Sequence, residues 1–216
     1  MERIICLLIG YACGLFQTAY IMGKIYHTDI RKQGSGNLGS TNVMRTLGKK
    51  AGALNLLCDC LKCVAAILIV RALFEDGYAD ILPLLSLYAA AGCILGHNFP
   101  FYLNFKGGKG IAASVGLLAA FDWRLLLICA VVFFALFFTT HYVSLCSISA
   151  YVIAFILMVV FGQRGDYHMD QSHMLELYVV MAFLTVLALF RHKKNIQRLL
   201  DGTESQIYLG KKKKNQ

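Results

Sequence analysis

Residues 96–114 read GHNFPFYLNFKGGKGIAAS and interrupt a chain that is otherwise mostly apolar. One apolar segment ends at Leu95 and another begins at Ile111, so this stretch predicts a loop between two helices. Within it, residues 106–110 (KGGKG) place three glycines among two lysines. Glycine amides are not shielded by a Cβ, and the helix start that follows adds partial positive charge, so the loop predicts a phosphate-binding site. The alternative is a simple turn whose lysines reach the membrane surface.

The composition is that of a membrane protein. Of 216 residues, 58% are hydrophobic and only 15% are charged, too few polar groups to cover a soluble domain. The net charge of +9 would suggest nucleic acid as the partner of a soluble protein. In a membrane protein it indicates lysine and arginine on the cytoplasmic side, so we expect a lipid bilayer and no nucleic acid as the partner.

Seven apolar segments predict an all-α, polytopic membrane protein with about seven transmembrane helices. The segments at 81–95 and 111–120 are shorter than the minimum of about 17 residues that a spanning helix needs, so five helices are the alternative. We expect residues 1–216 to form a single integral-membrane domain with a short basic tail at about 205–216. The segments are residues 4–25, 53–73, 81–95, 111–120, 123–142, 144–161 and 174–190.

The distribution of positive charge predicts the orientation. Sixteen of the 21 lysines and arginines fall in the chain between residues 24 and 50, in the glycine-containing loop, or after residue 190. Because cytoplasmic loops carry an excess of lysine and arginine, we expect the amino terminus outside and the carboxyl terminus in the cytoplasm. The three polar segments with unusual chemistry would then share the cytoplasmic face.

The eight cysteines lie within or beside apolar segments, where cysteine behaves as a small hydrophobic residue. Cys58, Cys60 and Cys63 are close in sequence, but no second cysteine pair or nearby histidine completes a tetrahedral set. We therefore expect no disulfide framework, no metal and no cofactor.

A second polar segment, residues 34–42, reads GSGNLGSTN and is followed by Arg45. The hydroxyls of Ser35 and Thr41 and the glycine amides are short donors that suit an oxyanion, and the Arg45 guanidinium can form paired hydrogen bonds with it. The alternative is a solvated loop that needs these residues only for its turns.

Two further sites carry polar residues beside apolar ones. Asp59 and Lys62 lie three residues apart on one face of a predicted helix, and we expect a structural ion pair rather than a direct catalytic part. Ser144 begins a predicted helix, where it can cap the helix or bind an anion.

The last polar segment follows residue 190. His192 and Asn195 are three residues apart, hence neighbours if the helix continues, and His192 lies beside a basic cluster. The alternative is a surface histidine at the headgroup boundary. Residues 211–214 are four lysines that we expect to touch anionic lipid.

Three separated motifs carry a resemblance to a known family: residues 34–42, residues 96–110, and a group formed by His192, Asn195, Gly202 and Glu204. In this order they make the chain resemble the bacterial acyl-phosphate:glycerol-3-phosphate acyltransferases. Ser40, Ala113 and His141 depart from the residues usual in that family, and none of the three removes a charged ligand.

The resemblance implies transfer of a fatty acyl group from acyl phosphate to the 1-hydroxyl of glycerol 3-phosphate. The products would be lysophosphatidic acid and phosphate, at the first step of phospholipid synthesis in the bacterial plasma (inner) membrane. A separate enzyme would supply the acyl phosphate, and the site would face the cytoplasm.

Site residues follow in three groups. We expect catalytic parts for five, substrate binding by eleven, and structural parts for Glu204 as well as for Asp59 and Lys62. The catalytic group is Ser35, Arg45, Lys106, His192 and Asn195; the binding group is Gly36, Asn37, Gly39, Thr41, Asn42, His97, Gly107, Gly108, Lys109, Gly110 and Ser144.

The acceptor of the hydroxyl proton is either His192 or an oxygen of the acyl phosphate, and we favour the substrate. An acyl-enzyme on Ser35 is possible but lacks an adjacent base in the sequence. Two other classes compete with an enzyme: a phosphate transporter, which would need more polar residues at helix midplanes, and a lipid-binding scaffold, which leaves the glycine-rich loops unexplained.

Overall fold

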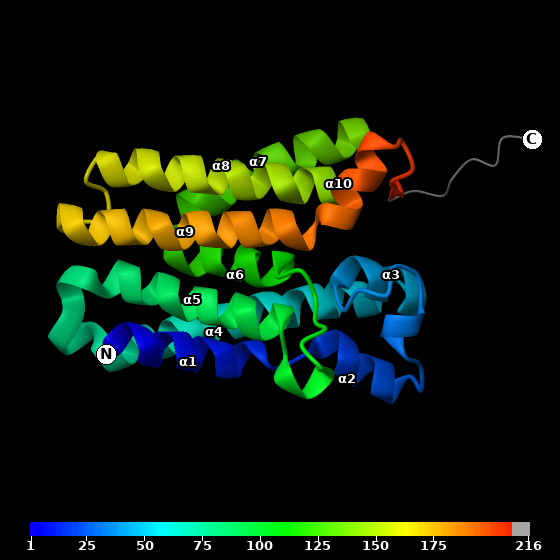
Figure 1. Ribbon diagram of the computed structural model, residues 1–216, viewed down its shortest axis with the longest axis horizontal. Coiled ribbons are helices and arrows are strands. Elements are labelled where there is room, and N and C mark those ends of the chain that lie inside the picture. Colours follow the sequence, from blue (N-terminus) through cyan, green and yellow to red (C-terminus); the bar gives the residue numbers. More distant parts are fainter. Residues whose placement is uncertain (209–216) are drawn as a thin grey trace, which may run out of the picture.

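The computed structural model of the chain describes residues 1–208, and over these residues every regular element is helical. Figure 1 shows the long helices running along one axis, with the short helices α2, α3 and α10 at one end. The basic tail expected at residues 211–214 lies outside the described residues. The α-helices are α1 (Glu2–Gly14), α2 (Thr18–Ile25), α3 (Ser40–Leu47), α4 (Lys49–Tyr78), α5 (Leu82–Asn98), α6 (Ile111–Phe121), α7 (Trp123–Thr140), α8 (Val143–Gln163), α9 (Gln171–Arg191) and α10 (Lys193–Leu200).

The helices form two groups joined through α6. In one group α1 lies along α5, and α4 packs against both α5 and α6. In the other, α8 packs against α7 and α9. Helix α6 contacts α4, α5 and α7, and α5 also contacts α9, so the two groups make one bundle (Figure 1).

The contact between α1 and α5 is close because both helices present glycine to each other. A Cβ on Gly10 would lie 1.9 Å from the carbonyl oxygen of Ala89, and one on Gly92 would lie 2.1 Å from that of Leu7. Small residues let helix backbones approach within a membrane, where van der Waals packing drives association. This approach brings the ends of α1 and α5 together beside the polar loops.

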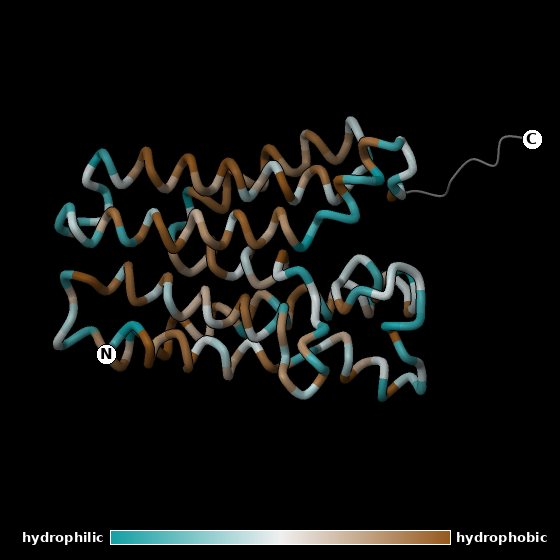
Figure 2. The backbone as a smooth tube through the Cα atoms, viewed as in Figure 1, coloured by the Kyte–Doolittle hydropathy of each residue, from teal (hydrophilic) through white to brown (hydrophobic). Residues whose placement is uncertain are grey.

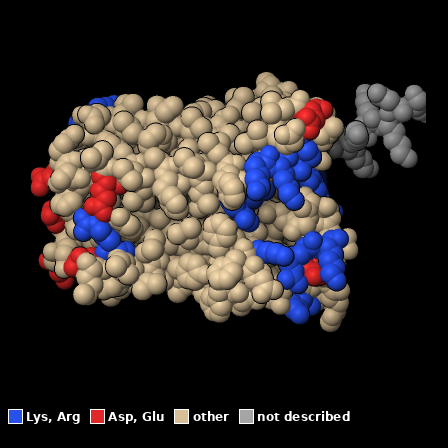
Figure 3. All heavy atoms as spheres, in the orientation of Figure 1, with Lys and Arg blue, Asp and Glu red and all other residues tan. Residues whose placement is uncertain are grey.

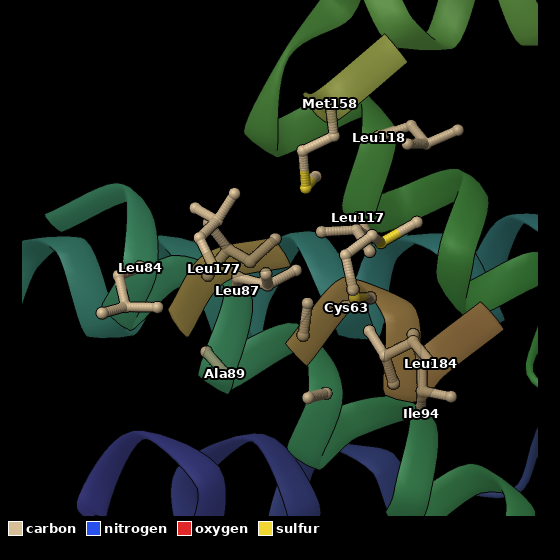
Figure 4. Close-up of a cluster of buried hydrophobic side chains, with 14 of the residues drawn as sticks. Cys63, Leu84, Leu87, Ala89, Ile94, Leu117, Leu118, Met158, Leu177 and Leu184 are labelled. Atoms are coloured by element: carbon tan, nitrogen blue, oxygen red, sulfur yellow. The ribbon is translucent and has the colours of Figure 1, made fainter. Parts of the chain in front are cut away.

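A buried apolar cluster fills the interior of the bundle. Cys63 of α4, Leu87 of α5, Leu117 of α6, Met158 of α8 and Leu177 of α9 are fully covered. Figure 4 shows their side chains directed into the space between these helices. The cluster therefore holds both helix groups in one arrangement.

Five segments are long and apolar enough to cross a membrane, and Figure 2 shows hydrophobic residues along the long helices with polar residues at both ends. Helices α4 and α5 fall in one such segment and pack against each other. All seven predicted apolar segments are helical, whereas the count of seven crossings and the orientation stay predictions. The five segments are Glu2–Ile25, Lys49–Leu103, Trp123–Thr140, Val143–Gln163 and Gln171–Arg191.

Two boundaries differ from the sequence prediction. The predicted helix at 4–25 is two helices, α1 and α2, and the break is filled by Gln17, whose Nε2 donates to the carbonyls of Gly14, Gly96 and His97 at 3.1–3.3 Å. Helix α3 lies where a loop was expected; its polar sequence lacks the apolar run that indicates a membrane helix.

Candidate functional site

The three predicted polar segments lie at the same end of the bundle. Helix α3, the loop that leads into α6 and helix α10 come together there (Figure 1). Figure 3 shows lysine and arginine side chains gathered at this end of the visible face, whereas most acidic side chains lie at the opposite end. The fold therefore concentrates positive charge where the motifs meet.

The glycine loop, residues 106–110, folds back onto the end of α5. The amides of Gly107 and Gly108 donate to the carbonyls of Asn98 and His97, each at 3.1 Å. A Cβ on Gly107 would lie 2.0 Å from the His97 carbonyl oxygen, and one on Gly108 would lie 2.1 Å from His97 Nε2. Both amides therefore already have acceptors, and glycine is needed here for close packing, while phosphate binding by this loop stays a prediction.

Gly110 ends the loop and caps α6. Its φ of +83° lies in the left-handed region that favours glycine. The Ser114 hydroxyl, one turn into the helix, donates to the Gly110 carbonyl at 2.9 Å. Gly110 thus fixes the direction in which the chain leaves Lys109.

Lys109 joins the loop to α10, and Glu204 extends this connection to the start of α8. Its Nζ donates to Asn195 Oδ1 at 2.5 Å, and Asn195 Nδ2 donates to Glu204 Oε1 at 2.7 Å. The same carboxylate accepts from Ser144 Oγ at 2.8 Å and from Arg198 Nε at 2.6 Å. Burial alone would raise the pKa of Glu204, but these hydrogen bonds lower it, so Glu204 is an anion that ties the chain after α10 to both α8 and α10.

The same cluster has a surplus of positive charge. Burial lowers the pKa of Lys109 to about 8; the charge of Glu204 opposes this shift, and those of Arg198, Arg191 and Arg45 add to it. A cation that is buried among other cations is stabilised by any anion that binds beside it. The arrangement therefore suits a phosphate group.

His192 lies at the junction of α9 and α10 and is 2% exposed. Its Nδ1 lies 2.8 Å from the carbonyl oxygen of Ala188, which can only accept, so Nδ1 carries the proton and Nε2 the lone pair. Burial, together with the charge of Lys109, lowers the pKa of His192 to about 4. The imidazole is therefore neutral near pH 7 and can accept a hydrogen bond through Nε2.

Asn42 shapes the second polar segment. Its Nδ2 donates to the carbonyls of Ile30 and Gln33 at 3.2 and 3.0 Å, and its Oδ1 accepts from the Ser35 amide at 2.9 Å. Its side chain is 1% exposed, so both of its donor hydrogens are already used. In this structure the Asn42 side chain holds its own loop, and binding of substrate by Asn42 stays a prediction.

The rest of that segment lies around Asn42. Gly36 has a φ of +69°, which favours glycine, whereas a Cβ on Gly39 would meet only the end of the Asn37 side chain, at 2.8 Å. Thr41 lies in the first turn of α3 and is half-buried. Thr41 and Arg45 lie on the same helix, and the loop that contains Gly36 and Gly39 leads into it.

Arg45 lines a cavity of about 260 Å³ between α3 and the chain after α10. That chain is held by hydrogen bonds from Gln206 Nε2 to the Thr140 carbonyl and from the Ile207 amide to the His141 carbonyl. The sequence offered no signal for this return of the chain across the site end. The cavity is lined by Met44, Arg45, Lys49, Gln206, Ile207 and Tyr208.

Two of the predicted catalytic residues make no contact with the cluster around Lys109 and Glu204 through side-chain hydrogen bonds, whereas Arg191, which was not predicted, binds the glycine loop. Ser35 and Lys106 are exposed and make no side-chain hydrogen bond to the described part of the chain. Arg191 was not predicted as a site residue, although it is the first cation after the last apolar segment. Its Nη2 donates to the carbonyls of Gly107 and Gly108 at 3.1 and 2.6 Å and thereby clamps the glycine loop.

The expected ion pair of Asp59 and Lys62 is present at 2.7 Å. Lys62 Nζ also lies 2.8 Å from His97 Nδ1, and His97 is 3% exposed. His97, which the sequence predicts to bind substrate, belongs to α5 and lies beneath the glycine loop, between that loop and α4. Its binding of substrate stays a prediction.

Three comparisons with known proteins bear on this arrangement. The family model described as glycerol-3-phosphate acyltransferase matches residues 4–202. A glycerol-3-phosphate acyltransferase of Clostridioides difficile is 42% identical over 212 residues, covering 97% of each chain. One of Lactiplantibacillus plantarum is 39% identical, covering 97% of this chain and 94% of that one.

Solved structures agree in fold. The crystal structure of PlsY, an integral membrane glycerol 3-phosphate acyltransferase, in its glycerol 3-phosphate form superimposes with a TM-score of 0.82 at 30% identity, covering 96% of both chains. The lysophosphatidic acid form superimposes with a TM-score of 0.80 at the same identity and coverage.

Proposed function

Because the chain belongs to the glycerol-3-phosphate acyltransferase family, we propose that it uses acyl phosphate as donor and acylates the 1-hydroxyl of glycerol 3-phosphate. The products are lysophosphatidic acid and inorganic phosphate. Acyl phosphate reaches the site from a separate enzyme that produces it. Solved forms of PlsY with glycerol 3-phosphate and with lysophosphatidic acid support the acceptor and the product.

The observation that carries the proposal is the cluster around Lys109. Both substrates are phosphates, and a surplus of partly buried positive charge suits two such anions. Lys109 Nζ lies 2.5 Å from Asn195 Oδ1, and the charges of Arg45 and Arg191 both lower the pKa of Lys109. In our proposal Lys109 and Asn195 bind the phosphate of glycerol 3-phosphate, and Arg45 with Lys106 binds the acyl phosphate.

Transfer then proceeds directly. The hydroxyl oxygen attacks the acyl carbonyl carbon, the bond from that carbon to the phosphate oxygen breaks, and phosphate leaves. Holding the two groups at about 3–3.5 Å supplies much of the rate enhancement. Nearby cations stabilise the oxyanion of the tetrahedral intermediate.

The hydroxyl proton goes to an oxygen of the departing phosphate. An imidazole whose pKa is about 4 is a weak base, so we propose that His192 does not take this proton. Its Nε2 instead accepts a hydrogen bond from the 2-hydroxyl of glycerol 3-phosphate and thereby positions the substrate. No acyl-enzyme is needed. Ser35, the candidate nucleophile, has no base hydrogen-bonded to its hydroxyl among the described residues.

A direct assay tests the donor. Purified protein in detergent is mixed with glycerol 3-phosphate and, in parallel, with acyl phosphate, acyl-CoA or acyl carrier protein carrying the same chain. We expect lysophosphatidic acid and one equivalent of phosphate from acyl phosphate alone. Product from a thioester, with none from acyl phosphate, would contradict the proposal. Lys109→Met is the matched inactive control.

We further propose that the site end of the bundle faces the cytoplasm of a bacterial plasma membrane. Cysteine variants at Lys194 and Gln163, exposed residues at the two ends, test this with a membrane-impermeant maleimide. We expect Gln163→Cys to be labelled in intact cells and Lys194→Cys only after permeabilisation, with the native chain as background. The reverse pattern would overturn the orientation.

A further inference from the structure

A row of buried polar side chains on α4 connects helix α3 to His97, the residue beneath the glycine loop. Asn55, Asp59 and Lys62 are 0%, 1% and 6% exposed, and their spacing places them on one helix face. Asn55 Nδ2 donates to Asp59 Oδ2 at 2.8 Å, and Thr18 Oγ1 donates to Asp59 Oδ1 at 3.3 Å. The row is therefore a connected network inside the membrane protein.

Asn55, at one end of the row, also donates to Ser40 Oγ of α3 at 2.9 Å, and Lys62, at the other end, touches the residue beneath the glycine loop. The Nζ of Lys62 has three acceptors: the Phe16 carbonyl at 2.7 Å, Asp59 Oδ1 at 2.7 Å and His97 Nδ1 at 2.8 Å. An ammonium group has three donors and no acceptor, so all three are used and His97 Nδ1 must carry a lone pair. The proton of the neutral imidazole then resides on Nε2.

His97 transmits this arrangement to the loop. Its Nε2 packs against Gly108, where even a single methyl group would lie 2.1 Å away. Its carbonyl accepts from the Gly108 amide at 3.1 Å and from Gln17 Nε2 at 3.1 Å. Lys109, whose Nζ donates to Asn195, directly follows Gly108 in the chain.

We propose that Asp59 and Lys62 are positioning residues for acyl transfer. Through His97 they hold the glycine loop in the position from which Lys109 binds the phosphate of glycerol 3-phosphate. This rests on the proposed function for the identity of the ligand. A buried ion pair contributes little net stability compared with apolar residues of similar size, so stability alone does not explain its presence.

The key variant replaces both charges together, Asp59→Leu with Lys62→Met. Removing Lys62 alone leaves a buried carboxylate without its partner and can prevent folding, whereas the double change keeps the volume and leaves no unpaired charge. We expect a monodisperse protein with a near-native melting temperature, a KM for glycerol 3-phosphate raised at least about tenfold, and kcat reduced much less.

The matched control lies on the same two helices. Arg71 Nε of α4 donates to Ser86 Oγ of α5 at 3.2 Å, and Ser86 is fully buried. Ser86 lies about 16 Å along α5 from His97, since a helix rises about 1.5 Å per residue. Ser86→Ala should leave both KM values unchanged. A double variant with native KM values, or one whose activity falls only in proportion to folded protein, would overturn the proposal.

A second readout does not depend on activity. Nitrogen-15 spectra of labelled histidine, assigned with His97→Asn, report which ring nitrogen carries the proton. We expect His97 to be entirely in the Nε2–H form in the native protein and to be a mixture of the Nε2–H and Nδ1–H forms in the double variant. The Nδ1–H form in the native protein would overturn the inference. If native protein fails to make lysophosphatidic acid but shows the Nε2–H form, the proposed reaction fails and the internal contact stands.

Discussion

The Nζ of Lys109 lies 2.5 Å from Oδ1 of Asn195, so a single hydrogen bond joins the glycine loop before α6 to the helix that follows α9. These residues are 86 positions apart in the chain. Arg191 also binds the glycine loop, and Glu204 also binds Asn195. The Lys109–Asn195 hydrogen bond therefore completes a set of contacts that holds the glycine loop and α10 together at the site end of the bundle. The reaction that we propose depends on these contacts.

Lys109 should set the alkaline limit of activity. Its pKa is lowered to about 8, so the free protein loses this charge above that pH, and kcat/KM for glycerol 3-phosphate should fall about tenfold per pH unit there. The substrate phosphates do not titrate in that range, because their second pKa is about 6. Initial rates between about pH 7 and 10 measure this.

Lys109→Arg keeps a permanent charge and should abolish the decline while lowering the maximal rate, since a guanidinium has different geometry. Lys194→Arg, an exposed change, is the control and should retain it. An unchanged decline in Lys109→Arg would assign the titration to another group.

His192 should make stability depend on pH. Its pKa is about 4 in the folded protein and about 6.5 in the unfolded chain, so the unfolded chain binds more protons between these values and stability falls as pH drops through this window. The loss should reach about 2 kcal/mol by about pH 5. Thermal unfolding at about pH 5 and 7.5 measures it, and His192→Gln should shrink the difference.

The same His192→Gln variant tests the proton acceptor. If the substrate phosphate takes the proton, turnover should survive within about tenfold, because glutamine can still accept a hydrogen bond from the 2-hydroxyl. A loss near about a thousandfold would make His192 the base.

Glu204 should be needed for the joint between α8 and α10. Glu204→Gln removes the charge that three donors share, and we expect unfolding in detergent to become easier by about 2 kcal/mol. Asp201→Asn is the control, because within residues 1–208 the Asp201 carboxylate accepts side-chain hydrogen bonds from the exposed Gln197 alone. Equal melting temperatures for both variants would show that the joint does not depend on Glu204.

Gly10 should be intolerant of any side chain. A Cβ there would lie 1.9 Å from the backbone of α5, so Gly10→Leu should separate α1 from α5 and abolish folded protein. Gly77→Ala is the control, because a Cβ at Gly77 meets nothing within 4 Å. The yield of monodisperse protein from size-exclusion chromatography distinguishes the two.

The sequence by itself determined the helical membrane class and which polar segments are candidates for the site. Apolar length and glycine content are local properties, so the helices around residues 53–73 and 174–190 and the interruption at residues 106–110 could be read without a structure. The ion pair of Asp59 and Lys62 was also predictable, since a helix brings residues three apart together.

Only the tertiary structure decided how the segments use their polar groups. The amides of Gly107 and Gly108 bind carbonyls of α5, the Asn42 amide holds its own loop, and Arg191 clamps the glycine loop from another helix. Each of these is a contact between groups that the chain brings together by packing. Residue type and spacing state which groups can donate or accept, whereas packing alone selects the partner.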